Sequence, residues 1–224
     1  MVLNKKVEAD KTIKANEAIE LLKKACQEKQ RKFVENVDVA INLTIDPKQT
    51  SQNIRGSISL PSGTGKQVKV IVLTEDDSLV KEAKEAGASE AGFTDLVTKI
   101  EGGWLGFDYI VATPDSMKKM GKLAKILGPR GLMPNPKNGN ITTEVGKVVK
   151  EITKGKVNFK NDRFGIVHVG VGKINFTTDD LLANIKAVIS ALKEAKPEGV
   201  KGKYIKDVYL TSTMGPSFII TLDK

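Results

Sequence analysis

The side chains best suited to bind a polar ligand lie in an uncharged run near the C-terminal end, Thr211-Ser-Thr-Met-Gly-Pro-Ser217. The hydroxyl groups of Thr211 and Thr213 can donate or accept hydrogen bonds, and Met214 offers a polarisable apolar surface. Gly215 has no side chain to stop a partner's backbone from approaching. Such a turn can lie against an RNA backbone and its ribose hydroxyls. An ordinary hairpin turn without a binding role is the alternative that these residues leave open.

Patterns for catalysis or phosphate binding are weak elsewhere in the sequence. Ser62-Gly-Thr-Gly-Lys66 resembles a phosphate loop, but Leu60 stands where that pattern needs Gly, and a predicted strand follows instead of a helix. Its glycines precede the strand, so the dinucleotide-binding fingerprint is absent too. His168 is the only histidine; it is a metal ligand, a catalyst, a structural residue or an RNA contact. Since no nucleophile–base pair stands out, we expect no enzymatic activity, no metal and no cofactor.

The composition is that of a globular protein of one large or two ordinary domains, with 224 residues and 40% hydrophobic residues. No apolar run approaches the ~18 residues that a membrane helix needs, and the first residues lack the apolar stretch of a signal peptide. The single cysteine, Cys26, rules out an internal disulfide. We therefore expect a cytoplasmic protein that does not bind membranes.

Positive charge is concentrated in parts of the chain, and the net charge is +9. Residues 67–115 hold 4 basic and 10 acidic side chains, whereas residues 116–157 hold 10 basic and 2 acidic ones. This division favours one face turned toward a polyanion over an evenly solvated surface.

A loop in the basic segment, Gly128-Pro-Arg-Gly-Leu-Met-Pro-Asn-Pro-Lys-Asn-Gly139, is the second informative stretch. Three prolines stiffen it, and Arg130 and Lys137 are its only charged residues, so it would lose little entropy on binding. The predicted helix after it carries Lys147 on its outer side. A simple solvated connection would not need three prolines and two apolar residues.

Hydrophobic periodicity in both ends of the chain predicts helices and half-buried strands. We expect helices over 16–30 and 177–196, alternating strands over 37–45 and 54–60, a hairpin of 157–160 with 166–169, and a second hairpin of 204–210 with 218–222. The capping pair Thr177 and Asp180 begins the second helix. These elements together predict one antiparallel α+β domain with two helices.

The middle of the chain alternates short apolar strands, at 68–73, 89–93 and 109–112, with helices. That order predicts a parallel sheet flanked by helices, an α/β unit of Rossmann-like type. We therefore predict a split α+β domain, residues 1–63 and 158–224, and an inserted α/β domain, residues 64–157.

Several segments, taken together and in this order, resemble the family of large-subunit ribosomal protein one, the protein of the mobile stalk near the tRNA exit site. They are Gln52-Asn-Ile-Arg-Gly-Ser-Ile-Ser-Leu-Pro, Gly128-Pro-Arg-Gly-Leu-Met-Pro-Asn-Pro-Lys, Asn161-Asp-Arg with Gly165, Lys196-Pro-Glu-Gly and Thr213-Met-Gly-Pro-Ser. They span nearly the whole chain, and the run from Gly128 is highly specific. Asp207, where relatives have Ser near the RNA, and a longer segment over Ala25–Lys32 depart from the pattern.

The resemblance implies a structural ribosomal protein that binds large-subunit ribosomal RNA, assists release of deacylated tRNA from the exit site and represses its own operon mRNA. The RNA-binding residues that it implies in the split domain lie in three segments. They are Lys32 and Phe33, then Asp162, Arg163, Gly165 and His168, and finally Thr211, Thr213, Met214 and Gly215. Arg130, Lys137 and Lys147 would make secondary RNA contacts from the insert. A monomer when free, associated with the ribosome and without a small-molecule substrate, is expected.

Two other classes of function remain as alternatives. An α/β enzyme that uses a nucleotide would need a phosphate loop or a catalytic triad, and neither pattern is found. A two-domain metabolite-binding protein would show a saturable small-molecule site between its domains.

Overall fold

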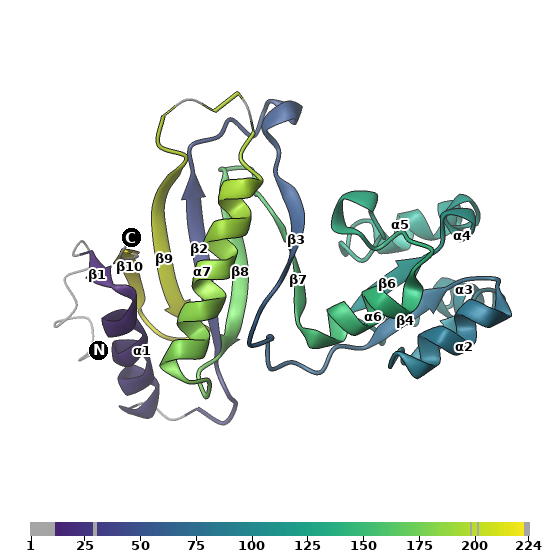
Figure 1. Cartoon of the computed structure of the whole chain (residues 1–224), viewed down its shortest axis with the longest axis horizontal. Coiled ribbons are helices and arrows are strands. Elements are labelled where there is room, and N and C mark those ends of the chain that lie inside the picture. Colours follow the sequence, from purple (N-terminus) through teal and green to yellow (C-terminus); the bar gives the residue numbers. More distant parts are fainter. Residues whose placement is uncertain (1–11, 29–30, 198, 201, 222–224) are drawn as a thin grey trace. The chain divides into compact units, whose positions relative to one another are not determined.

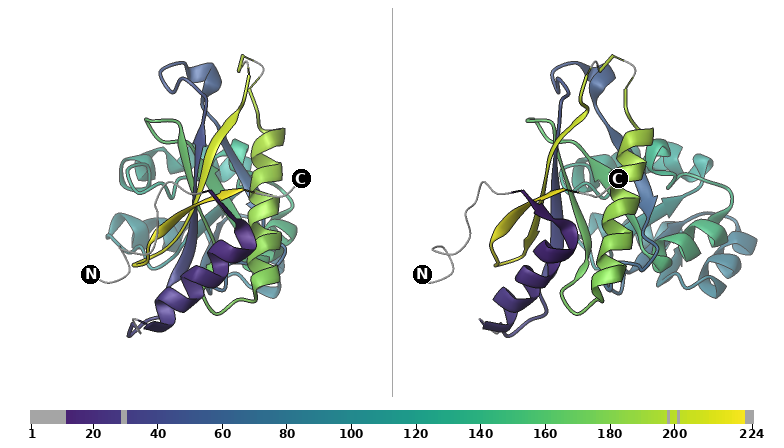
Figure 2. Two further views of the ribbon diagram at one scale, coloured as in Figure 1. Left: turned by 90° about the vertical axis from the view of Figure 1, so that its left-hand side faces the viewer. Right: turned by 60° about the vertical axis from the view of Figure 1, so that its left-hand side comes forward.

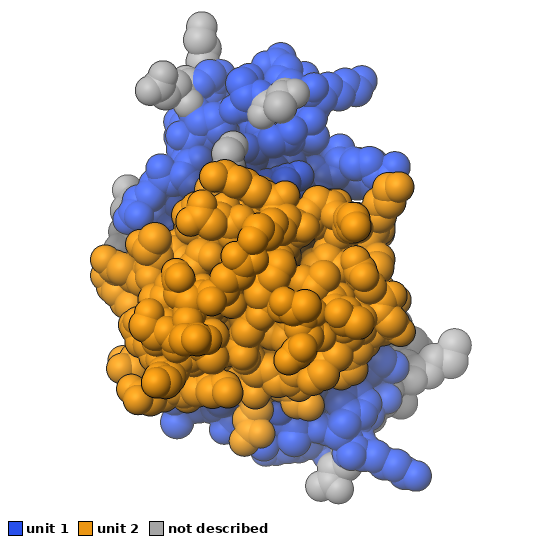
Figure 3. Space-filling view, turned by 90° about the vertical axis from the view of Figure 1, so that its right-hand side faces the viewer, with its two compact units in different colours: residues 1–65, 157–224 blue, residues 66–156 orange. Residues whose placement is uncertain are grey.

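The computed structural model describes residues 12–28, 31–197, 199–200 and 202–221, apart from the side chains of Thr50 and Lys137 (Figure 1). The chain separates into two compact units. Unit 1 consists of residues 1–65 and 157–224, and unit 2 consists of residues 66–156 (Figure 3). Leu222, which the sequence places in the last strand, lies outside the described residues. Unit 1 is thus assembled from both ends of the chain.

Unit 1 contains a five-stranded sheet in the order β1-β10-β9-β2-β8. Its strands are β1 (Ile13–Lys14), β2 (Asn36–Leu43), β8 (Ile166–Lys173), β9 (Ile205–Ser212) and β10 (Ser217–Thr221). All pairs are antiparallel except β1 with β10. In β2 the apolar residues are buried and the residues between them are not, which confirms the alternation predicted from the sequence.

Two helices, α1 (Ala15–Glu28) and α7 (Thr178–Glu194), cover one face of this sheet (Figure 2). Ile19 and Leu22 of α1 and Ile185 of α7 pack in the same core as the inward side chains of β2, β8 and β9. Thr177 caps α7, because its Oγ1 accepts a hydrogen bond from the backbone N–H of Asp180 at 3.1 Å. The same hydroxyl group donates a hydrogen bond to the side-chain carboxylate of Asp180 at 2.6 Å. The capping pair expected from the sequence is confirmed.

A separate two-stranded sheet pairs β3 (Arg55–Ser59) with β7 (Lys156–Lys160), and η2 (Thr50–Gln52) precedes it. The prediction that residues 157–160 form a hairpin with 166–169 is wrong, since β8 pairs with β2 instead. The contacts of Asn161 explain why β7 pairs with β3 and not with β8. Its backbone N–H donates to Ile54 O at 3.1 Å and its Oδ1 accepts from Ile54 N at 2.8 Å, so β7 is bound to the β3 side. Only a single bridge, Asn161 with Val167, joins the two segments.

Unit 2 is built around a parallel sheet in the order β5-β4-β6, which confirms the predicted α/β alternation. Its strands are β4 (Val70–Leu73), β5 (Glu90–Gly92) and β6 (Tyr109–Ala112), and its helices are α2 (Asp77–Glu85), α3 (Thr94–Glu101), α4 (Pro114–Lys119), η3 (Met120–Leu123), α5 (Ala124–Leu127), η4 (Pro136–Asn138) and α6 (Val145–Lys154). Helices α2 and α6 pack on one face of the sheet, and α3, η3 and α5 pack on the other. Both faces are covered, as is usual for a parallel sheet.

The predicted fold class is confirmed: an antiparallel α+β unit formed by both chain ends, with an α/β unit inserted. Within the described part of the chain, no helix has the length and apolar character needed to cross a lipid bilayer. That residues 1–63 and 158–224 can fold as a domain without the insert stays a prediction.

Candidate nucleic-acid interface

Within unit 1, the described helices α1 and α7 pack on one face of the five-stranded sheet, and no described helix of this unit covers the opposite face (Figure 2). Residues paired across strands point to the same side, so the outward side chains form rows. One row is Gly170, Asp38, Thr211 and Ser217; the next is His168, Ala40, Tyr209 and Ile219; the third is Ile166, Asn42 and Asp207. None of these residues is buried. We call these rows the open face.

One end of the open face is the turn of residues 213–216, which is bound to Asn36, the first residue of β2. Thr213 Oγ1 accepts a hydrogen bond from Asn36 N at 3.0 Å and lies 3.4 Å from Asn36 O, to which it can donate. Thr211 Oγ1 can donate to Ser212 O at 3.1 Å or to Pro216 O at 3.3 Å. The hydroxyl groups that the sequence offers to a ligand are therefore engaged inside the protein, where they fix the position of the turn.

A buried carboxylate, Glu35, lies beneath this turn and is only 3% exposed. It accepts hydrogen bonds from Ser212 Oγ at 2.8 Å and Met214 N at 3.1 Å, and Arg31 Nε lies 3.6 Å away. Burial by itself raises the pKa of Glu35, but these hydrogen bonds and the Arg31 charge outweigh it and hold the pKa below its ordinary value. The carboxylate therefore stays ionised and connects the turn to segment 31–36.

Gly215 is required by this packing and not by its backbone conformation. Its φ lies outside the left-handed region in which glycine is favoured. A Cβ at this position would collide with Ser212 Oγ, which is held by Glu35. The predicted close approach of RNA to Gly215 stays a prediction, but the protein alone already accounts for the glycine.

Apolar side chains project from both segments at this end. Phe33 is 54% exposed and Met214 is 57% exposed. Arg31 ties the segments together further, since its guanidinium donates to Met214 O at 3.4 Å. Phe33 lines a groove of about 490 Å³ together with Arg31, Lys32, residues of α1 that include Lys23, and residues 174–176. This end therefore offers a stacking surface next to basic groups, which suits an unpaired base and its phosphate.

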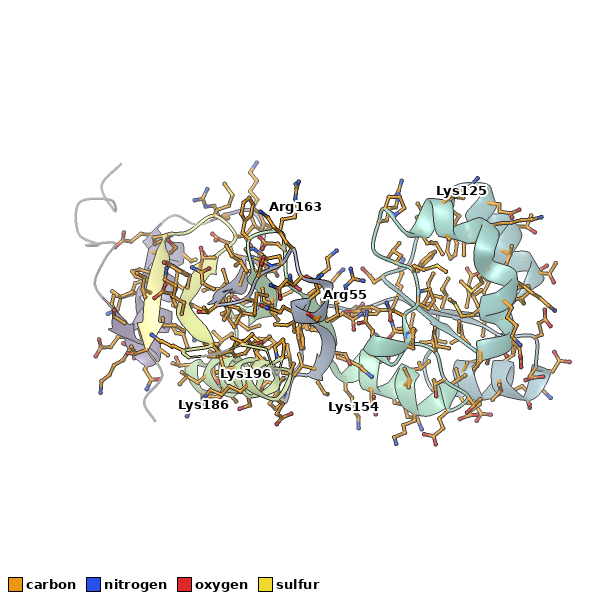
Figure 4. All side chains as sticks on the ribbon, turned by 90° about the horizontal axis from the view of Figure 1, so that it is seen from above. Arg55, Lys125, Lys154, Arg163, Lys186 and Lys196 are labelled. Atoms are coloured by element: carbon orange, nitrogen blue, oxygen red, sulfur yellow. The ribbon has the colours of Figure 1, made fainter. Side chains whose placement is uncertain are left out.

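The other end of the open face is the turn at residues 162–165. Asp162 Oδ1 accepts hydrogen bonds from the backbone N–H groups of Phe164 and Ile166, both at 2.8 Å. Burial raises the pKa of Asp162. The two hydrogen bonds and the neighbouring His168 lower it by a larger amount, so the pKa is below its ordinary value. Gly165 has a φ of 78° and packs on Leu43 and Ile45. Asp162 and Gly165 thus shape a turn that exposes Arg163, which lies on the opposite side of unit 1 from Lys186 and Lys196 (Figure 4).

His168 lies in the middle row of the open face, opposite Ala40. Its Nε2 is 3.8 Å from Asp162 Oδ2, and its side chain is exposed. The described residues contain no group of three or more histidine, cysteine, aspartate or glutamate side chains that could hold a metal ion. Of the roles left open by the sequence, this position favours a structural or RNA-contacting residue.

The predicted site residues of unit 1 therefore fall into two clusters, one near each end of β2. Lys32, Phe33 and the turn from Thr211 to Gly215 meet at the end of the sheet where β2 begins, whereas Asp162, Arg163 and Gly165 lie where β2 ends. About six residues of β2 separate the clusters, or about 20 Å at the rise of a strand. His168 lies between them. The open face joins both clusters, so one extended ligand could reach all of them.

The predicted residues of unit 2 lie apart from one another in its sequence, and the side chains of Arg130 and Lys147 are exposed. Arg130 is exposed in the loop after α5, where Leu132 and Met133 pack against the core, and Lys137 falls in η4, with its side chain outside the described residues. Lys147 is on the outer side of α6, 3.7 Å from Glu144. The loop is thus anchored to the core by Leu132 and Met133. The RNA contacts of Arg130, Lys137 and Lys147 stay predictions.

Sequence reasoning missed several residues of this surface. Glu35 carries no signal of burial in the sequence, because a charged residue just before a strand is usually solvated. Asp38 and Tyr209 are visible as the outward positions of alternating strands, but only the pairing of β2 with β9 places them in neighbouring rows. Burial raises the pKa of Asp38, and His168 partly offsets this effect. Phe164, 81% exposed at the tip of its turn, could have been found as an aromatic residue within a Gly-containing turn.

Comparison with known proteins agrees with this architecture. The Ribosomal protein L1p/L10e family matches residues 21–216. A protein named large ribosomal subunit protein uL1 from Protochlamydia amoebophila is 46% identical over 97% of this chain and 91% of its own length. Proteins of the same name from Chlamydia pneumoniae and a Shewanella species are 48% and 46% identical over 96% and 99% of the chain, and over 91% and 95% of their own lengths. The chain therefore belongs to the ribosomal protein L1 family.

Proposed function

We propose that this protein is a structural component of the large ribosomal subunit that binds ribosomal RNA through the open face of unit 1. The observation that carries the proposal is a sheet face that no described helix of unit 1 covers, with exposed Phe33 and Met214 at one end and exposed Arg163 at the other. Membership of a family of structural ribosomal proteins confirms that the chain is not an enzyme and is associated with ribosomes.

The chemistry of the open face favours the ribose side of RNA over its phosphates. Its middle carries the carboxylates of Asp38 and Asp207, the phenol of Tyr209 and the imidazole of His168. Carboxylates accept hydrogen bonds from ribose 2′-hydroxyl groups and repel phosphates, and 2′-hydroxyl groups are exposed in the shallow minor groove of RNA. Basic side chains lie at the ends, where Lys32 and Arg163 can meet phosphates. Asp207, although it differs from the serine of relatives, suits this arrangement as a hydrogen-bond acceptor.

The direct test is a filter-binding titration of the protein with large-subunit ribosomal RNA fragments at several salt concentrations. If about 5 to 7 phosphates are neutralised, log K falls against log salt with a slope of roughly −4 to −6. One fragment should bind much more tightly than a scrambled RNA of equal length. Equal affinity for both RNAs, or an affinity unchanged between low and moderate salt, would contradict the proposal.

Unit 2 is proposed to make secondary contacts with the same RNA through Arg130, Lys137 and Lys147. Surface lysines contribute mainly screened, sequence-independent attraction, so the specific contacts belong to unit 1. In support of this division, the two exposed apolar contact residues, Phe33 and Met214, are both in unit 1. Joining residues 1–63 to 158–224 through a short linker should give a protein that folds and keeps most of the affinity; stronger binding by residues 64–157 alone would contradict this assignment.

Two finer roles follow from the family resemblance: assistance in release of deacylated tRNA from the exit site, and repression of the protein's own operon mRNA. Repression needs only that the mRNA copies the shape of the ribosomal site, because the same open face would then bind both RNAs. Added protein should lower in-vitro translation of its own mRNA, and excess ribosomal RNA fragment should restore it. For tRNA release, subunits lacking the protein should release deacylated tRNA more slowly than subunits to which it has been added back.

A further inference from the structure

Phe164 is an aromatic side chain that the protein does not use for its own packing. It is 81% exposed, more than Phe33 or Met214, and it lies at the tip of the turn that ends at Gly165. Single exposed apolar residues are common on protein surfaces, so exposure alone assigns no role to Phe164, but it leaves the ring free to contact a partner.

The backbone under Phe164 is held in place before any partner binds. Its own N–H donates to Asp162 Oδ1 at 2.8 Å, and the N–H of Ile166 donates to the same oxygen at 2.8 Å. Asp162 N donates to Ile166 O at 2.8 Å, which closes the turn from the other side. A side chain on such a turn loses little conformational entropy on binding, because only its own rotation remains to be fixed.

Cationic residues lie next to this turn in the sequence and on the paired strands β3 and β7 that precede it. Arg163 precedes Phe164 directly, and Lys160 ends the adjoining strand β7. Because Asn161 is bonded to Ile54, the next residues outward, Arg55 and Lys160, lie on neighbouring strands. All three cations are exposed, and within the described part of the chain none of them takes part in an ion pair. An aromatic ring with unpaired cations beside it matches the pattern that binds single nucleotides, with the base on the ring and the phosphate on the cations.

We propose that Phe164 is a base-stacking residue that captures one unpaired nucleotide of the bound RNA, with Arg163, Lys160 and Arg55 placed to meet its phosphates. The inference rests on the proposed RNA-binding function and extends it to a second stacking site, about 20 Å along the open face from Phe33. An RNA that satisfies both sites must present unpaired bases at both ends of the contacted segment. The turn thereby selects for RNA structure and not only for charge.

The test uses the full chain and large-subunit ribosomal RNA fragments that carry 2-aminopurine at single unpaired purines. Phe164→Leu keeps an apolar group and removes the ring, and Phe164→Tyr keeps the ring as the matched control. Because the side chain is exposed, neither change should alter the thermal unfolding midpoint. We expect Phe164→Leu to weaken binding by about 5- to 20-fold with an unchanged salt slope, and Phe164→Tyr to bind within about twofold of the parent.

The fluorescence identifies the captured base. One labelled position should be quenched by the parent and by Phe164→Tyr but not by Phe164→Leu, whereas Arg163→Gln should reduce the salt slope by about 1 and leave that quenching in place at saturation. If the parent binds a fragment specifically and Phe164→Leu binds it equally well, the stacking site is refuted while the proposed function stands. If the parent binds no fragment specifically, the proposed function itself fails and this inference fails with it.

Discussion

Replacing Glu35 by glutamine tests whether a buried carboxylate positions the turn of residues 213–216. Glutamine has nearly the same shape, and with its amide oxygen in the place of Glu35 Oε2 it can still accept the hydrogen bonds of Ser212 Oγ and Met214 N. Both bonds would lose the strengthening that a negative charge gives them, and the ion pair between Oε1 and Arg31 would be lost. The amide NH2 group of the glutamine would stand where Glu35 Oε1 now is, so that this donor faces Arg31 Nε, which is also a donor.

The expected loss of unfolding free energy follows from these contacts. A hydrogen bond to a charged group contributes about 1.5–3 kcal/mol, and removing the buried charge recovers part of its desolvation cost. We therefore expect Glu35→Gln to destabilise the protein by about 2 kcal/mol at neutral pH. Since the pKa of Glu35 is below its ordinary value of 4.5, the carboxylate stabilises the fold above that value, and the contribution is lost as the pH falls through the folded-state pKa. The difference between parent and variant should shrink accordingly in acid.

Urea unfolding of parent and variant at a series of pH values measures this difference. Glu20→Gln is the matched control, because Glu20 is exposed on α1 and its replacement should change stability by less than about 0.5 kcal/mol. RNA affinity should fall with Glu35→Gln and not with the control. A variant as stable as the parent at neutral pH, or a difference that stays constant into acid, would refute the role given to the carboxylate.

Two further substitutions probe the turn and the insert. Gly215→Ala places a Cβ against Ser212 Oγ and should cost about 1–3 kcal/mol in chemical denaturation, whereas Gly121→Ala, at a glycine with open space around it, should be close to neutral. An equal cost for both would contradict the packing argument. Lys147→Ala removes an exposed cation near Glu144 and should change stability by only a few tenths of a kcal/mol while lowering the salt slope of RNA binding by about 1. A tenfold loss of affinity from Lys147→Ala would place the main RNA contacts in unit 2.

The fold was predictable from the sequence to the extent that hydrophobic periodicity determined it. The alternation in β2, the capping pair at Thr177 and the strand–helix order of unit 2 are local patterns, and each is confirmed. The family resemblance stated from the motifs is confirmed as well. The pairing of β7 was mispredicted because it depends on Asn161, whose bonds to Ile54 span more than a hundred residues of chain.

The candidate site was predictable as a set of residues but not as a mechanism. Thr213 was expected to offer its hydroxyl to RNA, yet the hydroxyl is bonded to Asn36, so a Thr213→Val variant would disturb the turn before it tested any RNA contact. Glu35 was missed because burial and partner atoms come from the tertiary structure. Asp162, expected as a contact, is engaged by backbone N–H groups and so acts first on its own turn.

The central claim, that RNA lies on the open face of unit 1, is tested most directly by making the same substitution on both sides of that unit. Ala40→Glu introduces a negative charge between His168 and Tyr209 in the middle of the open face, and Ala183→Glu introduces it on the exposed side of α7. With unfolding midpoints checked for both, the dissociation constant for the ribosomal RNA fragment is measured at one salt concentration. We expect Ala40→Glu to weaken binding by about tenfold or more, through repulsion at close range, and Ala183→Glu to change it by less than about twofold. Equal affinities for the two variants, or a greater loss from Ala183→Glu, would contradict the claim.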